Sequence, residues 1–174
     1  MSKFATKVGT LRSLGVSNVL RVASYRIGLK SGLHPVQRIT AETATGPFFG
    51  LIRHPPPAGA VARDDWQSGT ARAFGQPVVQ SNDEPPDWFC PLNEGACARD
   101  QRPWWNIPDF DPRVGDIKRI WEASRFDWIL PMAQRAALGD VDEQIRLNAW
   151  ISDWSAQNHP YRGVNWKCGQ EASI

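Results

Sequence analysis

Apolar residues recur at helical spacing in two runs of the last third of the chain. Intervals of three and four residues place such positions on one side of an α-helix, so each set is expected to form the apolar face of a helix. The first run follows Ser124 and comprises Phe126, Ile129, Leu130, Ala133, Ala136 and Ala137. The second follows Asp140 and comprises Val141, Ile145, Ala149 and Trp150, widened by Ile151 and Trp154.

Short polar residues mark the expected starts of helices. Asp116, Ser124 and Asp140 each precede an apolar-periodic run, where a side-chain oxygen can cap the free N–H groups of a first helical turn. The link Leu-Gly-Asp at 138–140 is so short that its flanking helices are expected to be antiparallel. A breaker-rich loop follows at 158–163, and a new helix is expected from Asn165.

The N-terminal pattern predicts another amphipathic helix, starting at about Ser17 and ending at Ser31-Gly32. It has two candidate roles, as a surface or docking helix or as a helix that covers a core, and we expect the second. Its apolar residues are Val19, Leu20, Val22, Ala23, Ile27 and Leu29, and its polar side carries Arg21, Arg26 and Lys30.

The middle of the chain predicts little regular structure. Three segments rich in β-branched and aromatic residues are expected to be strands or extended segments: Val36 to Thr40, Pro47 to Ile52, and Ala71 to Val79. From Gln80 to Pro112 turn-forming residues dominate, and the aromatic residues embedded among them are expected to pin a long loop to a larger body.

Composition narrows the function classes only slightly. The chain has 174 residues and a net charge of +2, so bulk charge implies neither nucleic acid nor an anionic membrane. No signal-peptide core and no run of membrane-spanning length is present, so a cytoplasmic protein is expected. Nine Trp indicate a bulky core, an aromatic groove or both. An N-terminal basic cluster, expected to be a solvated helix face, comprises Lys3, Lys7, Arg12, Arg21, Arg26, Lys30 and Arg38.

The three cysteines, Cys90, Cys97 and Cys168, do not have metal-site spacing. They form no CxxC pair and none lies at zinc-finger distance from a His, so no metal site is expected. A Cys90–Cys97 disulfide and three reduced thiols both fit the odd count, and we expect reduced thiols.

Familiar catalytic motifs do not occur in the chain. There is no GxSxG, P-loop, GxGxxG or HExxH sequence, and no cofactor is expected. The loop residues Asn158, His159, Tyr161 and Arg162 have the chemistry to neutralise a uronate carboxylate and remove the adjacent proton. Four residues of one loop can hardly converge on one substrate atom, so capping or turn roles are expected instead.

The C-terminal motifs resemble a known family. The runs PWWNIPDFDP, GDIKRIWEASRFDW and LNAWISDWSAQNHPYRGVNWKCGQEASI are similar to the N-terminal domain of the heparinase II/III-like polysaccharide lyases. The WE, SRFDW, GD and GVNW…E elements occur in the family's order and spacing. The resemblance is strong from about Arg102 to Ile174, and weaker before that.

The resemblance implies a mainly α fold: the opening helices of an incomplete (α/α) toroid, preceded by a loop-rich segment with a few short strands. We expect an N-terminal helix and irregular lead-in at 1–100 and the start of the toroid at 101–174. Family members cleave acidic polysaccharides such as heparan-type glycans or alginate by β-elimination, and some are associated with bacterial envelope-polysaccharide gene clusters. An acidic polysaccharide is therefore the expected partner, together with a missing C-terminal portion of the enzyme.

No catalytic residue is carried over from the family. Its Asn/His motif and Tyr lie after the GVNW…E block, beyond Ile174, and His159 and Tyr161 precede that block. A truncated portion that is inactive alone is expected, with a non-catalytic acidic-glycan-binding module or a helical interaction protein as alternatives. The candidate substrate-binding residues are Asn165, Trp166 and Glu171, for which cap, core or ion-pair roles are favoured, and Trp104 and Trp105.

Overall fold

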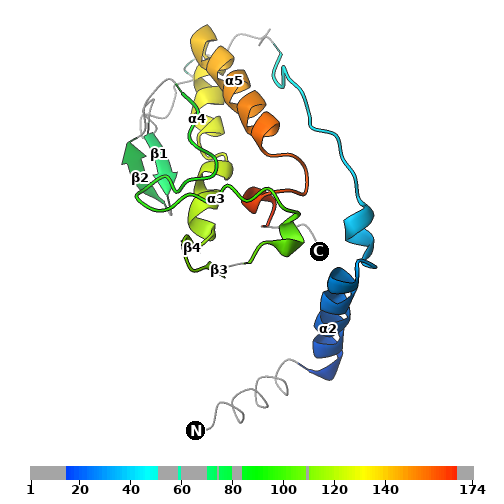
Figure 1. Ribbon diagram of the computed structural model, residues 1–174. Helices are drawn as coiled ribbons and strands as arrows, with labels where there is room; N and C mark the ends of the chain where they lie inside the picture. The colour runs from blue at the N-terminus through cyan, green and yellow to red at the C-terminus, as the bar shows by residue number, and fades with distance from the viewer. Residues whose placement is uncertain are drawn as a thin grey trace. The chain divides into compact units, whose positions relative to one another are not determined.

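The computed structural model describes residues 15–50, 59, 70–73, 75–79, 84–108 and 110–167. Most of its regular structure is helical, which confirms the expected mainly α class at that level (Figure 1). The chain divides into two compact units, Met1–Ala41 and Glu42–Ile174, which are called unit 1 and unit 2 below.

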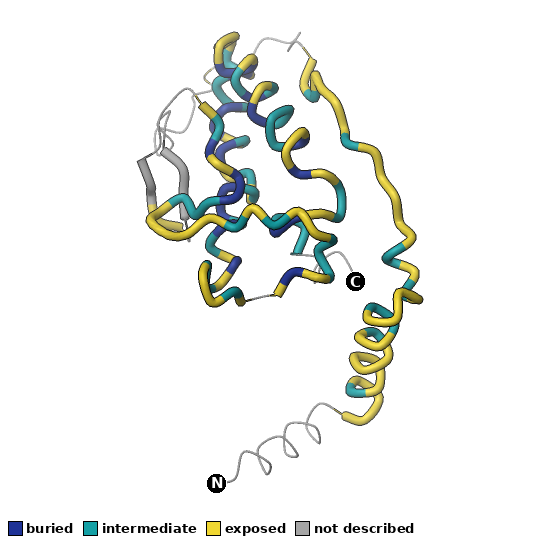
Figure 2. Tube along the Cα trace, viewed as in Figure 1, coloured by how far each residue is buried: buried dark blue, intermediate teal, exposed yellow. Residues whose placement is uncertain are grey.

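Unit 1 contains the expected N-terminal helix, α2 (Val16–Ser31), followed by the short 3₁₀ helix η1 (Pro35–Arg38). The predicted C-terminal cap is confirmed, because Gly32 adopts a left-handed conformation with φ of 77°. Two other predictions are wrong. No residue of α2 is buried, so it does not cover a core (Figure 2). The predicted strand from Val36 is η1 instead, because Pro35 starts a helical turn whose N-terminus is capped by His34 Nδ1.

Two small antiparallel sheets occur in the described part of unit 2. Strand β1 (Thr70–Ala73) pairs with β2 (Gln76–Val79), so the single strand expected from Ala71 to Val79 is a hairpin that turns at Gly75. Strand β3 (Phe110–Asp111) pairs with β4 (Gly115–Asp116). Residues 84–108 are largely irregular as expected, with one 3₁₀ turn, η2 (Trp104–Asn106).

Three helices form the body of unit 2: α3 (Lys118–Ser124), α4 (Ile129–Ala137) and α5 (Val141–Gln157). Helices α4 and α5 lie side by side and antiparallel, as their short link predicts (Figure 1). Asp140 caps α5, because its Oδ1 accepts a hydrogen bond from the N–H of Glu143 at 3.1 Å.

The cap predicted at Ser124 is wrong. Ser124 is the last residue of α3, and its hydroxyl accepts a hydrogen bond from Trp154 Nε1 at 3.0 Å. The backbone turns left-handed at Phe126, with φ of 61°, which separates α3 from α4. Val164–Trp166 form the 3₁₀ turn η3, and most of the helix predicted from Asn165 falls on residues 168–174, which lie outside the described part.

The predicted apolar faces of α4 and α5 are partly wrong. Ala136 and Trp150 of the predicted sets are buried, but Leu130, Val141 and Ile145 are exposed. The core side of α5 carries Leu147 and Trp150 together with the polar residues Glu143 and Gln144 (Figure 2). Because polar residues occupy core positions, a search for apolar periodicity selects the neighbouring face.

Glu143 is buried because two arginines accompany it. Its carboxylate accepts hydrogen bonds from Arg135 of α4 at 3.2 Å and from Arg146 at 2.8 Å. The Glu143 side chain is only 6% exposed, and a carboxylate at such a position is tolerated only when paired. This cluster joins α4 to α5 beside their link.

An extended segment, residues 42–50 (the strap), lies along α5 (Figure 1). Asn148 Oδ1 accepts from the N–H groups of Phe48 and Phe49, both at 2.9 Å. Gln144 Nε2 donates to Gly50 O at 2.6 Å, and Ser155 Oγ donates to Ala44 O at 2.6 Å. Side chains on one face of α5 thus form hydrogen bonds with backbone groups of the strap that are not paired in a sheet.

The core of unit 2 is built around tryptophan. The rings of Trp88, Trp128 and Trp150 are buried, with centroids 5.8 Å apart between Trp88 and Trp128 and 5.1 Å apart between Trp128 and Trp150. Phe126 links this group to Trp154, whose ring lies 4.9 Å away. The other buried apolar residues are Phe89, Ile107, Ile117, Ile120, Ala123, Met132, Ala136, Leu147 and Val164.

Cys90 and Cys97 form a disulfide, so the expectation of reduced thiols is wrong for this pair. The backbone hydrogen bond from Ala98 N to Phe89 O, at 2.8 Å, brings the ends of the loop together and places the two cysteines opposite each other. Cys168 lies outside the described residues. In the described part of the chain no helix is both long and apolar enough to cross a membrane.

The buried face of α5 and the exposed face of α4 can be tested with one leucine on each helix, Leu147 of α5 and Leu130 of α4. Leu147 is 2% exposed and Leu130 is 55% exposed. We expect Leu147→Ala to lower the free energy of unfolding by about 2–5 kcal/mol, because it leaves a cavity in the core. Leu130→Ala should lower it by less than about 0.5 kcal/mol. Urea unfolding followed by tryptophan fluorescence measures both, and equal losses would contradict the assigned faces.

Candidate functional site

The segment that contains Trp104 and Trp105 is held against the 158–163 loop. Gly163 N donates to Arg102 O at 3.0 Å, and Trp104 N donates to Tyr161 O at 3.1 Å. Between these bonds, Pro103 and Arg162 form an isolated antiparallel bridge. Two stretches that carry candidate residues therefore form one surface.

Trp104 and Trp105 are both half-buried. Their ring centroids are 5.8 Å apart and the ring planes make an angle of 80°. They therefore do not form a shared flat platform, and a sugar ring would stack on one of them at a time. Lys167 Nζ lies 5.7 Å from the centroid of the Trp104 ring, at cation–π distance.

Asn165 and Trp166 hold the end of the described chain to the core. Asn165 Nδ2 donates to Trp88 O and to Asn158 Oδ1, both at 2.8 Å, and Trp166 Nε1 donates to Asn158 O at 3.1 Å. The Trp166 ring lies between the Trp154 and Tyr161 rings, at 6.2 and 5.4 Å. The Asn165 Nδ2 and Trp166 Nε1 donors thus have structural partners, whereas the buried Asn165 Oδ1 has none among the described residues. Glu171 lies outside the described residues.

The candidate polar residues of the 158–163 loop have separate partners. Asn158 is 2% exposed and bonds to Asn165 and to Trp154 O. His159 is exposed, and its Nδ1 lies 2.9 Å from Thr43 Oγ1 of the strap. Tyr161 adopts a left-handed backbone with φ of 63°, which lets the loop turn back to meet Trp104. Separate partners of this kind are consistent with the capping or turn roles expected for these residues.

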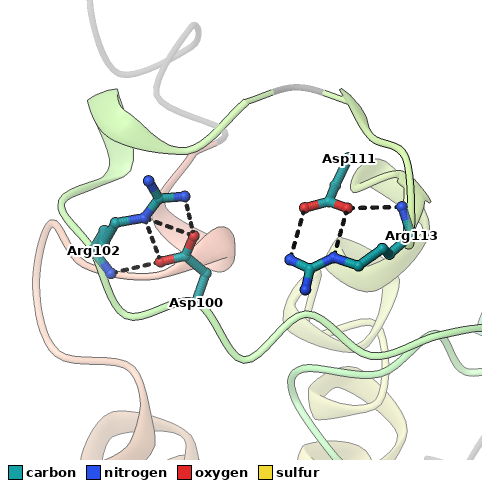
Figure 3. Close-up of polar contacts among 4 residues, drawn as sticks. All are labelled: Asp100, Arg102, Asp111 and Arg113. Atoms are coloured by element: carbon teal, nitrogen blue, oxygen red, sulfur yellow. Dashed lines mark hydrogen bonds and ion pairs between the residues drawn. The ribbon is translucent and has the colours of Figure 1, made fainter.

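Two Asp-x-Arg turns lie at the edge of this surface (Figure 3). Asp100 Oδ1 accepts from the backbone N–H of Arg102 at 2.9 Å, and Asp100 Oδ2 accepts from Arg102 Nη2 at 2.6 Å. Asp111 accepts from the backbone N–H of Arg113 at 2.8 Å. In each turn the carboxylate fixes both the backbone and the guanidinium of the residue two positions later.

The pairing changes the acidity of these groups. The side-chain hydrogen bond from Arg102 lowers the pKa of Asp100 below its ordinary value, and the same bond raises the pKa of Arg102. The backbone N–H of Arg113 is the main cause of a lowered pKa at Asp111, with its guanidinium second. Both carboxyl groups therefore have a pKa lower than that of an unpaired Asp and stay ionised to a lower pH.

One group of potential metal ligands occurs in the described part of the chain: Asp87, Cys90 and Cys97, whose ligand atoms lie within 4.8 Å of one another. Both sulfurs are in the disulfide and no thiolate is available, so this group does not fit a metal ion in the oxidised chain. Asp87 also pairs with Arg99.

Sequence reasoning named Arg162 but missed Arg102 and Lys167. Lys167 Nζ lies over the Trp104 ring, but the basic residues come from two stretches whose pairing is non-local. The Asp-x-Arg pattern, which occurs at Asp100 and Asp111, was the available local signal. Comparison of the chain with protein-family models, curated proteins and solved structures found no match.

The pKa direction at Asp100 gives a pH prediction. A carboxyl group whose pKa is lower in the folded chain stabilises the fold above its unfolded pKa, about 3.9, and this contribution is lost as pH falls through the folded value. We expect the stability difference between the unsubstituted chain and Asp100→Asn to be constant near neutral pH and to shrink below about pH 4. Urea unfolding across pH measures it.

The exposed Asp127 provides the control, because Asp127→Asn removes the same formal charge from the surface. A carboxyl resonance of Asp100 that titrates at or above the value for a short Asp peptide would contradict the assignment.

Proposed function

We propose that this chain is the opening helical part of a polysaccharide lyase of the heparinase II/III-like type, acting on uronic-acid-containing polysaccharide and inactive alone. The observation that supports it best is the meeting of the motifs that carry the resemblance. Trp121 of the RIWEASRFDW run donates its indole N–H to Val164 O of the GVNW run at 2.7 Å. Ser124 of the first run accepts from Trp154. Motifs far apart in sequence thus form one packed joint.

The helical hairpin supports the same proposal. A toroid of paired helices needs antiparallel hairpins that pack against further hairpins, and α4 and α5 form one such pair. Leu130, Val141 and Ile145 leave apolar side chains exposed on this pair, at 55%, 58% and 63%. A following helix pair would bury them, since exposed apolar side chains of this kind mark interaction surfaces.

The proposed contribution of the chain is binding rather than bond cleavage. β-Elimination needs a group that neutralises the uronate, a base that removes the C5 proton and an acid that assists the departing O4. We assign none of these roles to a residue of this chain. The Trp104 ring offers a face for a sugar, while Lys167 offers positive charge to a carboxylate.

The test is complementation. A lyase of this family is expressed without its own opening helices, alone and together with this chain. We expect unsaturated uronate, followed by its ultraviolet absorbance, on a heparan-type glycan or alginate only when both are present. The variant Val141→Asp with Ile145→Asp should abolish the rescue, because it would bury unpaired carboxylates between the α4–α5 pair and the helices that follow. Activity of the chain alone, or no rescue of any family member, would contradict the proposal.

A stand-alone acidic-glycan-binding module is the second candidate, favoured by the contact between Lys167 and Trp104. For either candidate we expect Trp104→Ala to weaken binding to a heparan-type glycan by about 0.5–1 kcal/mol, two- to fivefold in Kd. Phe110→Ala is the control, since Phe110 is 66% exposed and belongs to β3. Glycan affinity chromatography and calorimetry measure both. An equal loss for the two variants would show that Trp104 has no special role.

A further inference from the structure

The charge of the chain is strongly divided between its units. Unit 1 carries seven Lys and Arg and no Asp or Glu, whereas unit 2 carries thirteen Lys and Arg against eighteen Asp and Glu. The nearly neutral total of +2 therefore conceals a unit of +7 and a unit of −5. The charge that matters for a partner of unit 1 is therefore the +7 of that unit and not the total of +2.

Helix α2 has one face covered by its own chain. The ring of His34 packs edge-on against Tyr25 at 4.8 Å, and Gln37 Nε2 donates to Leu29 O at 2.8 Å. Partial burial on this face raises the pKa of Tyr25. Because the returning segment 33–38 occupies this side, any external partner must use another side of α2.

Another side of α2 presents an apolar stripe. Val16, Leu20, Ala23 and Ile27 follow one another at intervals of four, three and four residues, which places them in one line along the helix. All four are exposed, Val16 at 74%, Leu20 at 63% and Ile27 at 67% (Figure 2). Exposed branched side chains in a continuous line are costly in water unless a partner removes them from it.

Cations accompany the stripe on one of its sides. On a helical projection Arg26 and Lys30 lie beside one edge of the stripe, whereas Arg21 lies near Tyr25 on the covered side of α2. Long basic side chains can extend their charge sideways while their apolar stems remain beside the stripe. The combination of an apolar line, flanking cations and no acid is that of a helix that lies in the interface of an anionic bilayer.

We propose that unit 1 docks on an anionic lipid surface, with the α2 stripe in the acyl boundary and its cations at the level of the lipid phosphates. A second copy of the chain is disfavoured as the occupant, because pairing the stripes would bring two units of +7 together. An acidic groove of another protein fits less well, because the positive charge extends past the stripe to Arg38, whereas a bilayer is anionic over its whole extent. The inference does not depend on the proposed lyase function.

The test is sedimentation of the full chain with vesicles. We expect binding to phosphatidylcholine vesicles that contain phosphatidylserine, at least tenfold weaker binding to phosphatidylcholine alone, and weakening by salt. The variant Leu20→Gln with Ile27→Gln should lose most of the binding, and Arg26→Gln with Lys30→Gln should lose the preference for phosphatidylserine. Leu130→Gln, an equal change at an exposed leucine of unit 2, should bind like the unsubstituted chain.

Each of the following three outcomes would overturn the proposal. No binding to phosphatidylserine vesicles, with circular dichroism showing that the chain is folded, would exclude the lipid surface. Binding that Leu20→Gln with Ile27→Gln leaves unchanged would show adsorption by charge alone. A dimer by native mass spectrometry that the same variant dissociates would assign the stripe to a second copy.

Discussion

Hydrogen bonds from indole N–H groups hold the segments of unit 2 together. A buried Trp adds much apolar area to a core, and its N–H usually finds an acceptor. Five indole N–H groups bond to acceptors in other segments, so each of these bonds fixes one segment to another, whereas the buried Trp150 Nε1 has no partner among the described residues. The bonds run from Trp88 to Asp153, from Trp121 to Val164 O, from Trp128 to Ala123 O, from Trp154 to Ser124 and from Trp166 to Asn158 O. A loop-rich chain thereby acquires a fixed interior with few strands.

Two helix termini were predictable because their signals are local, although the cap predicted at Ser124 was wrong. Gly32 ends α2 and Asp140 caps α5 as their positions in the sequence indicate. The core-facing side of α5 was not predictable in the same way. Glu143 and Gln144 are buried only because Arg135 and the strap supply their partners, and the Gln144 partner, Gly50 O, lies 94 residues away in the chain.

The candidate surface shows the same division between local and non-local information. Trp104 and Trp105 could be singled out from the sequence as an aromatic pair in a turn-rich stretch. Their perpendicular planes and the position of Lys167 over Trp104 could not, because both depend on the bridge between Pro103 and Arg162. Unit 1 was misjudged for a further reason: amphipathic spacing shows that a helix has an apolar side without showing what covers it.

The way the strap is held has a consequence for the evolution of this sequence. Helix α5 contacts mainly the backbone of residues 42–50, so most side chains of the strap contribute little to its path. Gly46 is restricted, because an added Cβ would lie 2.8 Å from Ser152 Oγ, and the donor amides of Phe48 and Phe49 exclude proline. The strap is therefore free to drift in sequence while Gln144, Asn148 and Ser155 are held, and distant relatives would share α5 more closely than the segment it holds.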